Sequence, residues 1–279
     1  MQQARWMAAV SERGERGRPS PFVELGLGVS WLLGISAALQ ILDRLFPAAS
    51  LGTALIGALL VDVAASRLGV RWGLVAGADR AASSPFRLAA WRAGIGVSLA
   101  FKVGLLVIAI GAAAGWIHNH GGWPQPSFAI VLALLRAIAV SVRDELLYRG
   151  IPLFAASRAG VPAWAARLFA ALAGGAAIAL MPGVEASGIV LAVASGWLFA
   201  GLWQKEGGGF AAGGAHAAWL LLFGSLLHGG LFEVEWVHGN IAIGNGSSGP
   251  PAWIASGLCI AAGLILPRIT WPGGGAKSS

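Results

Sequence analysis

Long apolar segments are the feature that most limits what this chain can fold into. A run of about 17 to 25 apolar residues can cross the hydrocarbon core of a membrane. Only 11% of the 279 residues are charged and 57% are hydrophobic, which is too apolar for a soluble globule of this length. We therefore predict an all-α fold, a polytopic membrane helix bundle of about eight transmembrane helices. The candidate segments are residues 22–42, 51–70, 93–117, 128–149, 163–181, 187–204, 211–230 and 252–269.

The net charge of +7 follows from an uneven distribution of Lys and Arg among the loops. Basic residues gather in the N-terminal tail, in the loops after the second, fourth and sixth segments, and at the C-terminus. The loops between these hold a single arginine, Arg44. Lys and Arg collect on the cytoplasmic side of membrane proteins, so we predict that both termini are cytoplasmic. The positive charge then requires no nucleic-acid partner.

The chain is expected to have one folded domain between two tails. Residues 1–21 form a cytoplasmic tail and residues 271–279 a flexible one, because neither can bury much apolar surface. The domain between them, residues 22–270, contains the only cysteine, Cys259, which we interpret as a packing residue. The runs "AALAGGAAIA" and "AAGGAHAA" are rich in small residues and should let helix backbones approach closely.

Charged residues and one histidine fall inside the predicted membrane segments. An ionised group there costs several kcal/mol unless it is paired or faces protein or water, so each is a candidate site residue. Asp62, Lys102 and Arg136 suit either structural ion pairs or the relay of a small-solute transporter. The remaining four such positions are Arg143, Asp144, Glu145 and His216.

The stretch "RDELLYRG" is the densest of these clusters. On the segment boundaries above, Asp144 and Glu145 lie one to two turns from the cytoplasmic end of their helix, and His216 lies at a matching depth in another. The spacing of four predicts an ion pair between Glu145 and Arg149, while Asp144 points about 100° away and is free to address a substrate. Acids and a histidine in a poorly solvated pocket can activate water. The alternative is a charge group that only anchors the helix at the membrane boundary.

The segment "DELLYRG" resembles the E-E-x-x-x-R-G motif of the CPBP family, the CAAX-protease and bacteriocin-processing group of intramembrane endopeptidases. The runs "GGFAAGGAHAAWLLLFG" and "GNIAIGNGSSGPPAWIASGL" are similar to later parts of that family, so the motif-bearing region is about 128–266. The resemblance implies peptide-bond hydrolysis at the cytoplasmic side of a membrane. Asp144 would take the place of the water-activating glutamate, Glu145 that of the second acid, and Arg149 that of the motif arginine. His216 would hold the water or stabilise the oxyanion.

The chain departs from the family pattern at three positions, one of which is Asp144 in place of the first glutamate. Leu220 stands where the residue four after the histidine is normally Asn or Asp, and Leu180 stands where the middle motif has a histidine. The resemblance makes zinc possible, but the ligand set is incomplete because His216 is the only candidate near the acids.

The expected partners are the membrane and a protein with a membrane-anchored segment, and the expected location is the inner (cytoplasmic) membrane of a bacterium. Three functions follow from these features: a divergent endopeptidase, a degenerate member that binds membrane-protein segments without cutting them, and a small-solute transporter.

Overall fold

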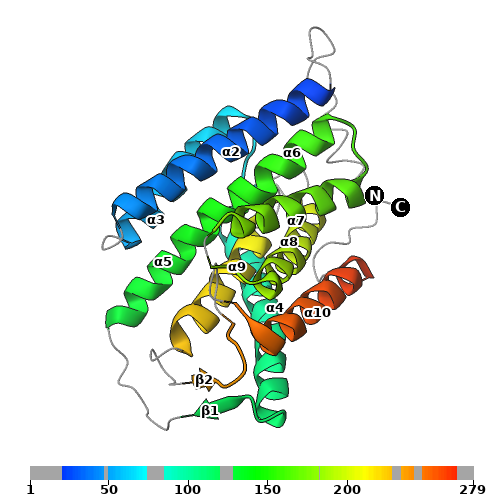
Figure 1. Ribbon diagram of the computed structural model, residues 1–279. Coiled ribbons are helices and arrows are strands. Elements are labelled where there is room, and N and C mark those ends of the chain that lie inside the picture. The colour runs from blue at the N-terminus through cyan, green and yellow to red at the C-terminus, as the bar shows by residue number, and fades with distance from the viewer. Residues whose placement is uncertain are drawn as a thin grey trace.

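The protein is a bundle of helices that pack around α8 and α9 (Figure 1). The computed structural model describes residues 21–46, 50–73, 85–119, 128–181, 183–227, 234–241 and 247–268. Almost all of both expected tails therefore lies outside the described residues. The helices are α2 (Pro21–Leu45), α3 (Ser50–Arg67), α4 (Pro85–Ala113), α5 (Phe128–Glu145), α6 (Ile151–Arg158), α7 (Ala163–Ala179), α8 (Ala186–Glu206), α9 (Phe210–Leu221) and α10 (Gly249–Ile265).

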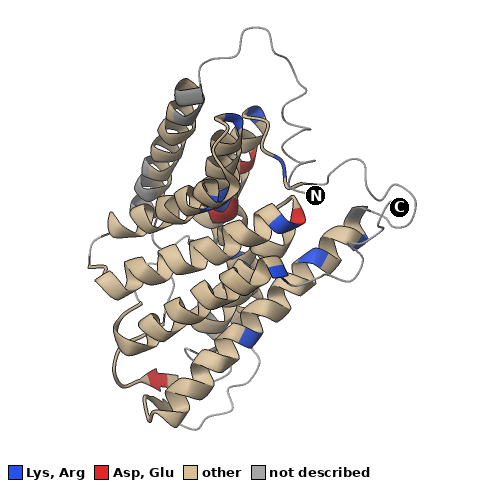
Figure 2. Ribbon diagram, turned by 90° about the vertical axis from the view of Figure 1, so that its right-hand side faces the viewer, with Lys and Arg blue, Asp and Glu red and all other residues tan. Residues whose placement is uncertain are grey.

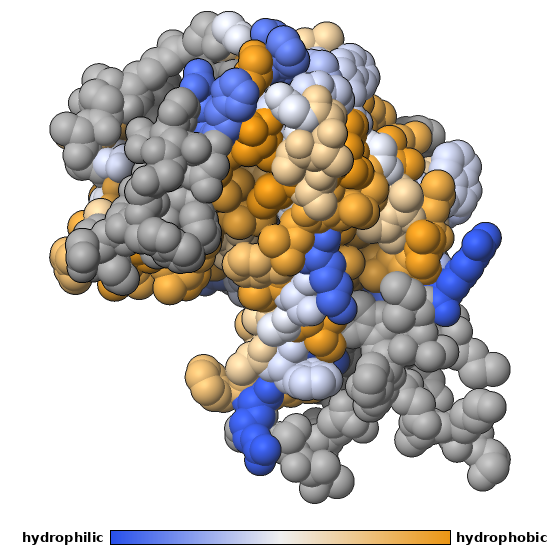
Figure 3. Space-filling model, turned by 90° about the horizontal axis from the view of Figure 1, so that it is seen from below, coloured by the Kyte–Doolittle hydropathy of each residue, from blue (hydrophilic) through white to orange (hydrophobic). Residues whose placement is uncertain are grey.

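The predicted helical bundle is confirmed, since each apolar segment coincides with a helix. Within the described chain, four helical stretches are long and apolar enough to cross a membrane: Ser50–Arg67, Phe86–Ala113, Ala186–Glu206 and Gly249–Arg268. Large apolar side chains such as Leu59, Leu105 and Leu264 are exposed on the outside of the bundle. Apolar residues also cover much of the face in Figure 3, and charged positions along the helices are few in Figure 2. Such a surface suits contact with lipid chains.

The fourth segment does not end at Gly150, as the sequence suggested. A π-helical turn, η2 (Leu146–Gly150), joins α5 to α6 and the helix continues to Arg158. The N–H of Ile151 donates to the carbonyl of Leu146, five residues earlier, as is characteristic of a π-helix. The wider turn absorbs Gly150 and Pro152 without a break. Glu145 therefore lies roughly 20 Å from the end of the continuous helix, and the predicted depth of one to two turns was wrong.

Two short antiparallel strands at one end of the bundle modify the all-α prediction. The strand β1 (Ile117–Asn119) pairs antiparallel with β2 (Val234–Trp236), with His118 opposite Glu235. The N–H of Val237 also donates to the carbonyl of Trp116 at 2.9 Å. Two loops that the charge pattern assigned to the same side thus meet at one end of the bundle (Figure 1).

Glycines bring α4 and α9 into very close contact. A methyl group at Gly96 would lie 1.8 Å from the carbonyl oxygen of Ala211, and one at Gly214 would lie 2.2 Å from that of Ala93. The small-residue run around Gly214 therefore packs as predicted. Since α9 carries His216, this contact also holds the candidate site in place.

Replacing Gly96 by alanine is expected to destabilise the bundle by about 1–3 kcal/mol or more, because the clash is with backbone that can move only with its helix. The matched control is Gly94→Ala, since a methyl group there meets nothing within 4 Å. Thermal unfolding in detergent should show a lower midpoint for Gly96→Ala and an unchanged or higher one for Gly94→Ala. Equal midpoints for the two variants would contradict the close approach of α4 and α9.

Candidate functional site

A fully buried carboxylate, Glu145, lies at the centre of the candidate site. Its side chain has no exposed surface, and both of its oxygens accept hydrogen bonds. Oε1 lies 2.9 Å from Nδ1 of His216 and 3.3 Å from Nη1 of Arg149, and Oε2 accepts from Nε1 of Trp203 at 2.9 Å. The predicted pair of Glu145 with Arg149 is confirmed, and so is the meeting of an acid with His216. Full burial excludes a charge group that only anchors a helix end at the membrane boundary.

Four elements bring these side chains together. Glu145 is the last residue of α5, and Arg149 lies in the π-helical turn that follows. His216 comes from α9 and Trp203 from the last turn of α8. Phe199, one turn before Trp203, stacks on the His216 ring with centroids 5.2 Å apart. The guanidinium carbon of Arg149 lies 5.5 Å from the same phenyl ring, so Phe199 contacts two of the partners of the carboxylate.

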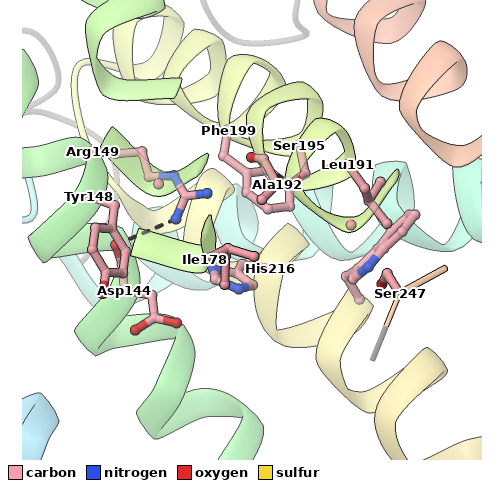
Figure 4. A pocket seen from close by; sticks show the side chains of 13 residues that line it. Asp144, Tyr148, Arg149, Ile178, Leu191, Ala192, Ser195, Phe199, His216 and Ser247 are labelled. Carbon is pink, nitrogen blue, oxygen red and sulfur yellow. Dashed lines mark hydrogen bonds between the residues drawn. The ribbon is translucent and has the colours of Figure 1, made fainter. Parts of the chain in front are cut away.

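A cavity of about 80 Å³ lies beside this carboxylate. The residues that line it come mainly from η2, α7, α8 and α9, and His216 lies among them in Figure 4. The lining includes the ionisable or hydroxyl-bearing side chains and the phenyl ring that stacks on His216: Asp144, Tyr148, Arg149, Ser195, Phe199, His216 and Ser247. Glu145 itself does not line the cavity, so the imidazole of His216 stands between the buried carboxylate and the open space.

The hydrogen bond with Glu145 determines the tautomer of His216. When the Glu145 carboxylate is ionised it can only accept, so Nδ1 of His216 then carries the proton of that bond. The other ring nitrogen, Nε2, has no hydrogen-bond partner among the described residues. A neutral imidazole in this state presents an unprotonated Nε2, which can accept a proton from a molecule in the cavity.

Asp144 reaches the cavity but is not a free acid. Its Oδ1 accepts a hydrogen bond from Nε of Arg143 at 2.7 Å, and its side chain is 14% exposed. The two acids do point to different surroundings, as the helical spacing predicted. Glu145 is paired with Arg149 as expected, but the expectation of a free Asp144 was wrong, because Asp144 is paired with the neighbouring Arg143.

The two leucines that depart from the family pattern lie outside the cavity lining. Leu180 caps the C-terminal end of α7 and is 67% exposed, and Leu220 is half-buried. On α7, Gly174 and Ile178 face the cavity instead. In the part of the chain that the structure describes, no three His, Cys, Asp or Glu side chains converge as metal ligands. These residues do not fit the ligand set of a zinc ion.

Three further charged residues that the sequence offered as candidates are not part of the site. Asp62 on α3, Lys102 on α4 and Arg136 on α5 are all exposed. Within the described ranges none of them forms an ion pair with another residue. They therefore do not make the structural ion pairs that the sequence suggested within the described part of the chain. Cys259 is buried in α10, in agreement with its interpretation as a packing residue.

Sequence reasoning missed Trp203 and Phe199. Aromatic residues four apart on an apolar helix normally indicate core packing, and nothing near them in the sequence is charged except Lys205 and Glu206. The one feature that could have indicated Trp203 was its indole N–H, because a buried indole N–H usually has a hydrogen-bond acceptor. Its acceptor lies 58 residues earlier in the chain, so only the fold could identify it.

No family model matches the chain, and no curated protein or solved structure matches it either.

Proposed function

We propose that this protein is an intramembrane endopeptidase that hydrolyses a peptide bond in or near a membrane-anchored segment of another protein. The observation that carries the proposal is the hydrogen bond between the fully buried Glu145 and Nδ1 of His216, whose ring lines a cavity inside a bundle of apolar helices. A carboxylate that orients a histidine in this way is the arrangement that makes imidazole an effective general base.

The proposed reaction assigns each group one task. Nε2 of His216 takes a proton from a water molecule as the water oxygen bonds to the carbonyl carbon of the substrate. The proton then passes to the amide nitrogen as the carbon–nitrogen bond breaks, which yields a carboxylic acid and an amine. Glu145 stabilises the imidazolium that forms between these steps. Arg149, whose guanidinium also lines the cavity, stabilises the negative charge that develops on the carbonyl oxygen.

The substrate class and the membrane arrangement rest on separate arguments. The resemblance of "DELLYRG" to the CPBP motif favours a protein substrate with a membrane-anchored segment. The alternation of loops rich in Lys and Arg with loops that hold a single arginine favours eight crossings with both termini cytoplasmic, in the inner membrane of a bacterium. The pairing of β1 with β2 agrees with this alternation because it brings two loops of low positive charge to one end of the bundle.

The proposal is tested by looking for new N-termini in membrane proteins. Membranes of the host are incubated with the purified protein in liposomes, and the protein fragments are identified by labelling of free amino groups and mass spectrometry. Fragments should appear with the native chain and be absent with His216→Ala. Cleavage that survives Asp144→Ala, Glu145→Ala and His216→Ala alike would overturn the proposal.

A binding protein without catalytic activity is the second candidate. It is favoured by the pairing of Asp144 with Arg143, because the position that the resemblance gives to the water-activating acid is then held in an ion pair. Crosslinking in the membrane would then trap intact partners equally well with the native chain and with His216→Ala, and no new N-termini would appear.

A further inference from the structure

A second cavity of about 170 Å³ has Trp203, a hydrogen-bond partner of Glu145, in its lining. It is formed where the end of α3, the π-helical turn, α6 and the end of α8 meet. Six of its lining residues are Val70, Arg71, Gly150, Phe154, Trp203 and Gln204. Arg71 is exposed, and Arg67, Arg92 and Lys205 belong to the same end of the bundle, which we call the basic-loop end.

Neighbouring residues in η2 and on α8 lie between the two cavities, and one of them, Trp203, donates its indole N–H to Glu145. Arg149 lines the first cavity and the next residue, Gly150, lines the second. On α8, Phe199 lines the first and Trp203, one turn later, lines the second. The indole of Trp203 therefore faces the second cavity while its N–H is bonded to Glu145.

Close packing holds this indole in the wall. A methyl group at Gly150 would lie 3.2 Å from Cη2 of Trp203, and one at Gly209 would lie 2.5 Å from Cζ2. The ring of Trp72 lies against the indole with centroids 5.9 Å apart. Trp72 is itself fixed, because its carbonyl accepts a hydrogen bond from the N–H of Gly209 at 3.2 Å.

The loop that carries Trp72 is tied to the turn between α8 and α9 by a second set of contacts. Arg92 donates to the carbonyl of Gly73 at 3.5 Å and lies 3.2 Å from Glu206. Trp203 is thus the side chain that separates a buried carboxylate from a cavity whose other walls reach exposed residues.

We propose that Trp203 is a gate between the Glu145–His216 pair and the basic-loop end of the bundle. With the indole in place, water and protons from that end do not reach the carboxylate. When the indole swings out, the second cavity becomes continuous with the space beside Glu145, and the buried pair exchanges water and protons with that side. This role holds whether or not the site cleaves a substrate.

The gate is tested by the accessibility of a cysteine placed at His216. In native membranes, a charged, membrane-impermeant methanethiosulfonate reagent is added from the basic-loop side only. Arg71→Cys and His118→Cys are exposed positions at opposite ends of the bundle and show which side the reagent reaches. His216→Cys should react slowly from the basic-loop side when Trp203 is present. In the Trp203→Ala background the rate should rise by an order of magnitude or more, whereas Trp203→Phe, which keeps a ring in the wall, should leave it low.

The buried Cys259 is an internal control, because it reacts only if the bundle opens as a whole. Should Trp203→Ala expose Cys259, Trp203→Leu becomes the deciding variant, since it keeps an apolar side chain in the wall. The proposal would be overturned if the cysteine at position 216 reacted at the same rate with the native Trp203, with Trp203→Phe and with Trp203→Ala or Trp203→Leu, while Cys259 stayed protected.

Discussion

Replacing Glu145 by alanine is expected to lower the free energy of unfolding by about 3–5 kcal/mol, because removal of one partner leaves a buried charge without compensation. Arg149 is 5% exposed and would lose its only ion-pair partner among the described residues. Nδ1 of His216 and Nε1 of Trp203 would lose their acceptor as well. Thermal unfolding in detergent, followed by tryptophan fluorescence, should show a large drop in the midpoint. The exposed Glu185 gives a matched control, and Glu185→Ala should leave the midpoint almost unchanged.

A double variant separates the charge from the rest of the network. Arg149→Met alone leaves the Glu145 carboxylate buried without its arginine and should cost about as much as loss of the acid. Glu145→Gln combined with Arg149→Met removes both charges together, so its loss should be clearly smaller than the sum of the two single losses. If the loss in the free energy of unfolding of the double variant equalled the sum of the two single losses, Glu145 and Arg149 would not stabilise each other.

Replacing His216 by alanine is expected to reduce the rate of peptide cleavage by about 10²–10⁴-fold, the usual contribution of a positioned general base. The measurement is the rate of product formation from a membrane protein identified by its new N-terminus. Ser195 and Ser247 also line the cavity, and their hydroxyl groups would be required if a serine attacked the carbonyl carbon in place of water. Ser195→Ala and Ser247→Ala should each keep most of the activity, and abolition by either would replace the water mechanism with a covalent one.

The positions of the helices could be predicted because membrane helices must be long and apolar. The continuation of α5 into α6 could not, since a glycine followed two residues later by a proline normally ends a helix, and only the surrounding packing favours the wider turn. The pairing of β1 with β2 was also missed. It joins segments more than a hundred residues apart, and such short strands leave almost no pattern in the sequence.

The candidate site was predictable where its geometry is local. The spacing of Glu145 and Arg149 sufficed for their ion pair, and the meeting of His216 with an acid was also predicted, although the depth on which that prediction rested was wrong. Which acid would be buried depended on the rotation of α5 against α8 and α9, and helical spacing alone does not determine that rotation. The contact of Asp144 with its own neighbour Arg143 was likewise overlooked in favour of partners farther away.

The π-helical turn between α5 and α6 determines which way its own residues face. A turn of this kind holds one residue more than an α-helical turn. Deleting a single residue between Leu146 and Gly150 would remove the extra residue and restore the α-helical hydrogen-bond pattern, while α5 and α6 on either side kept their phase. The residues of the turn itself would shift, so Arg149 and Gly150 would no longer face the two cavities as they do now. The chemistry of this region thus depends on one extra residue in a helix as much as on the charges it carries.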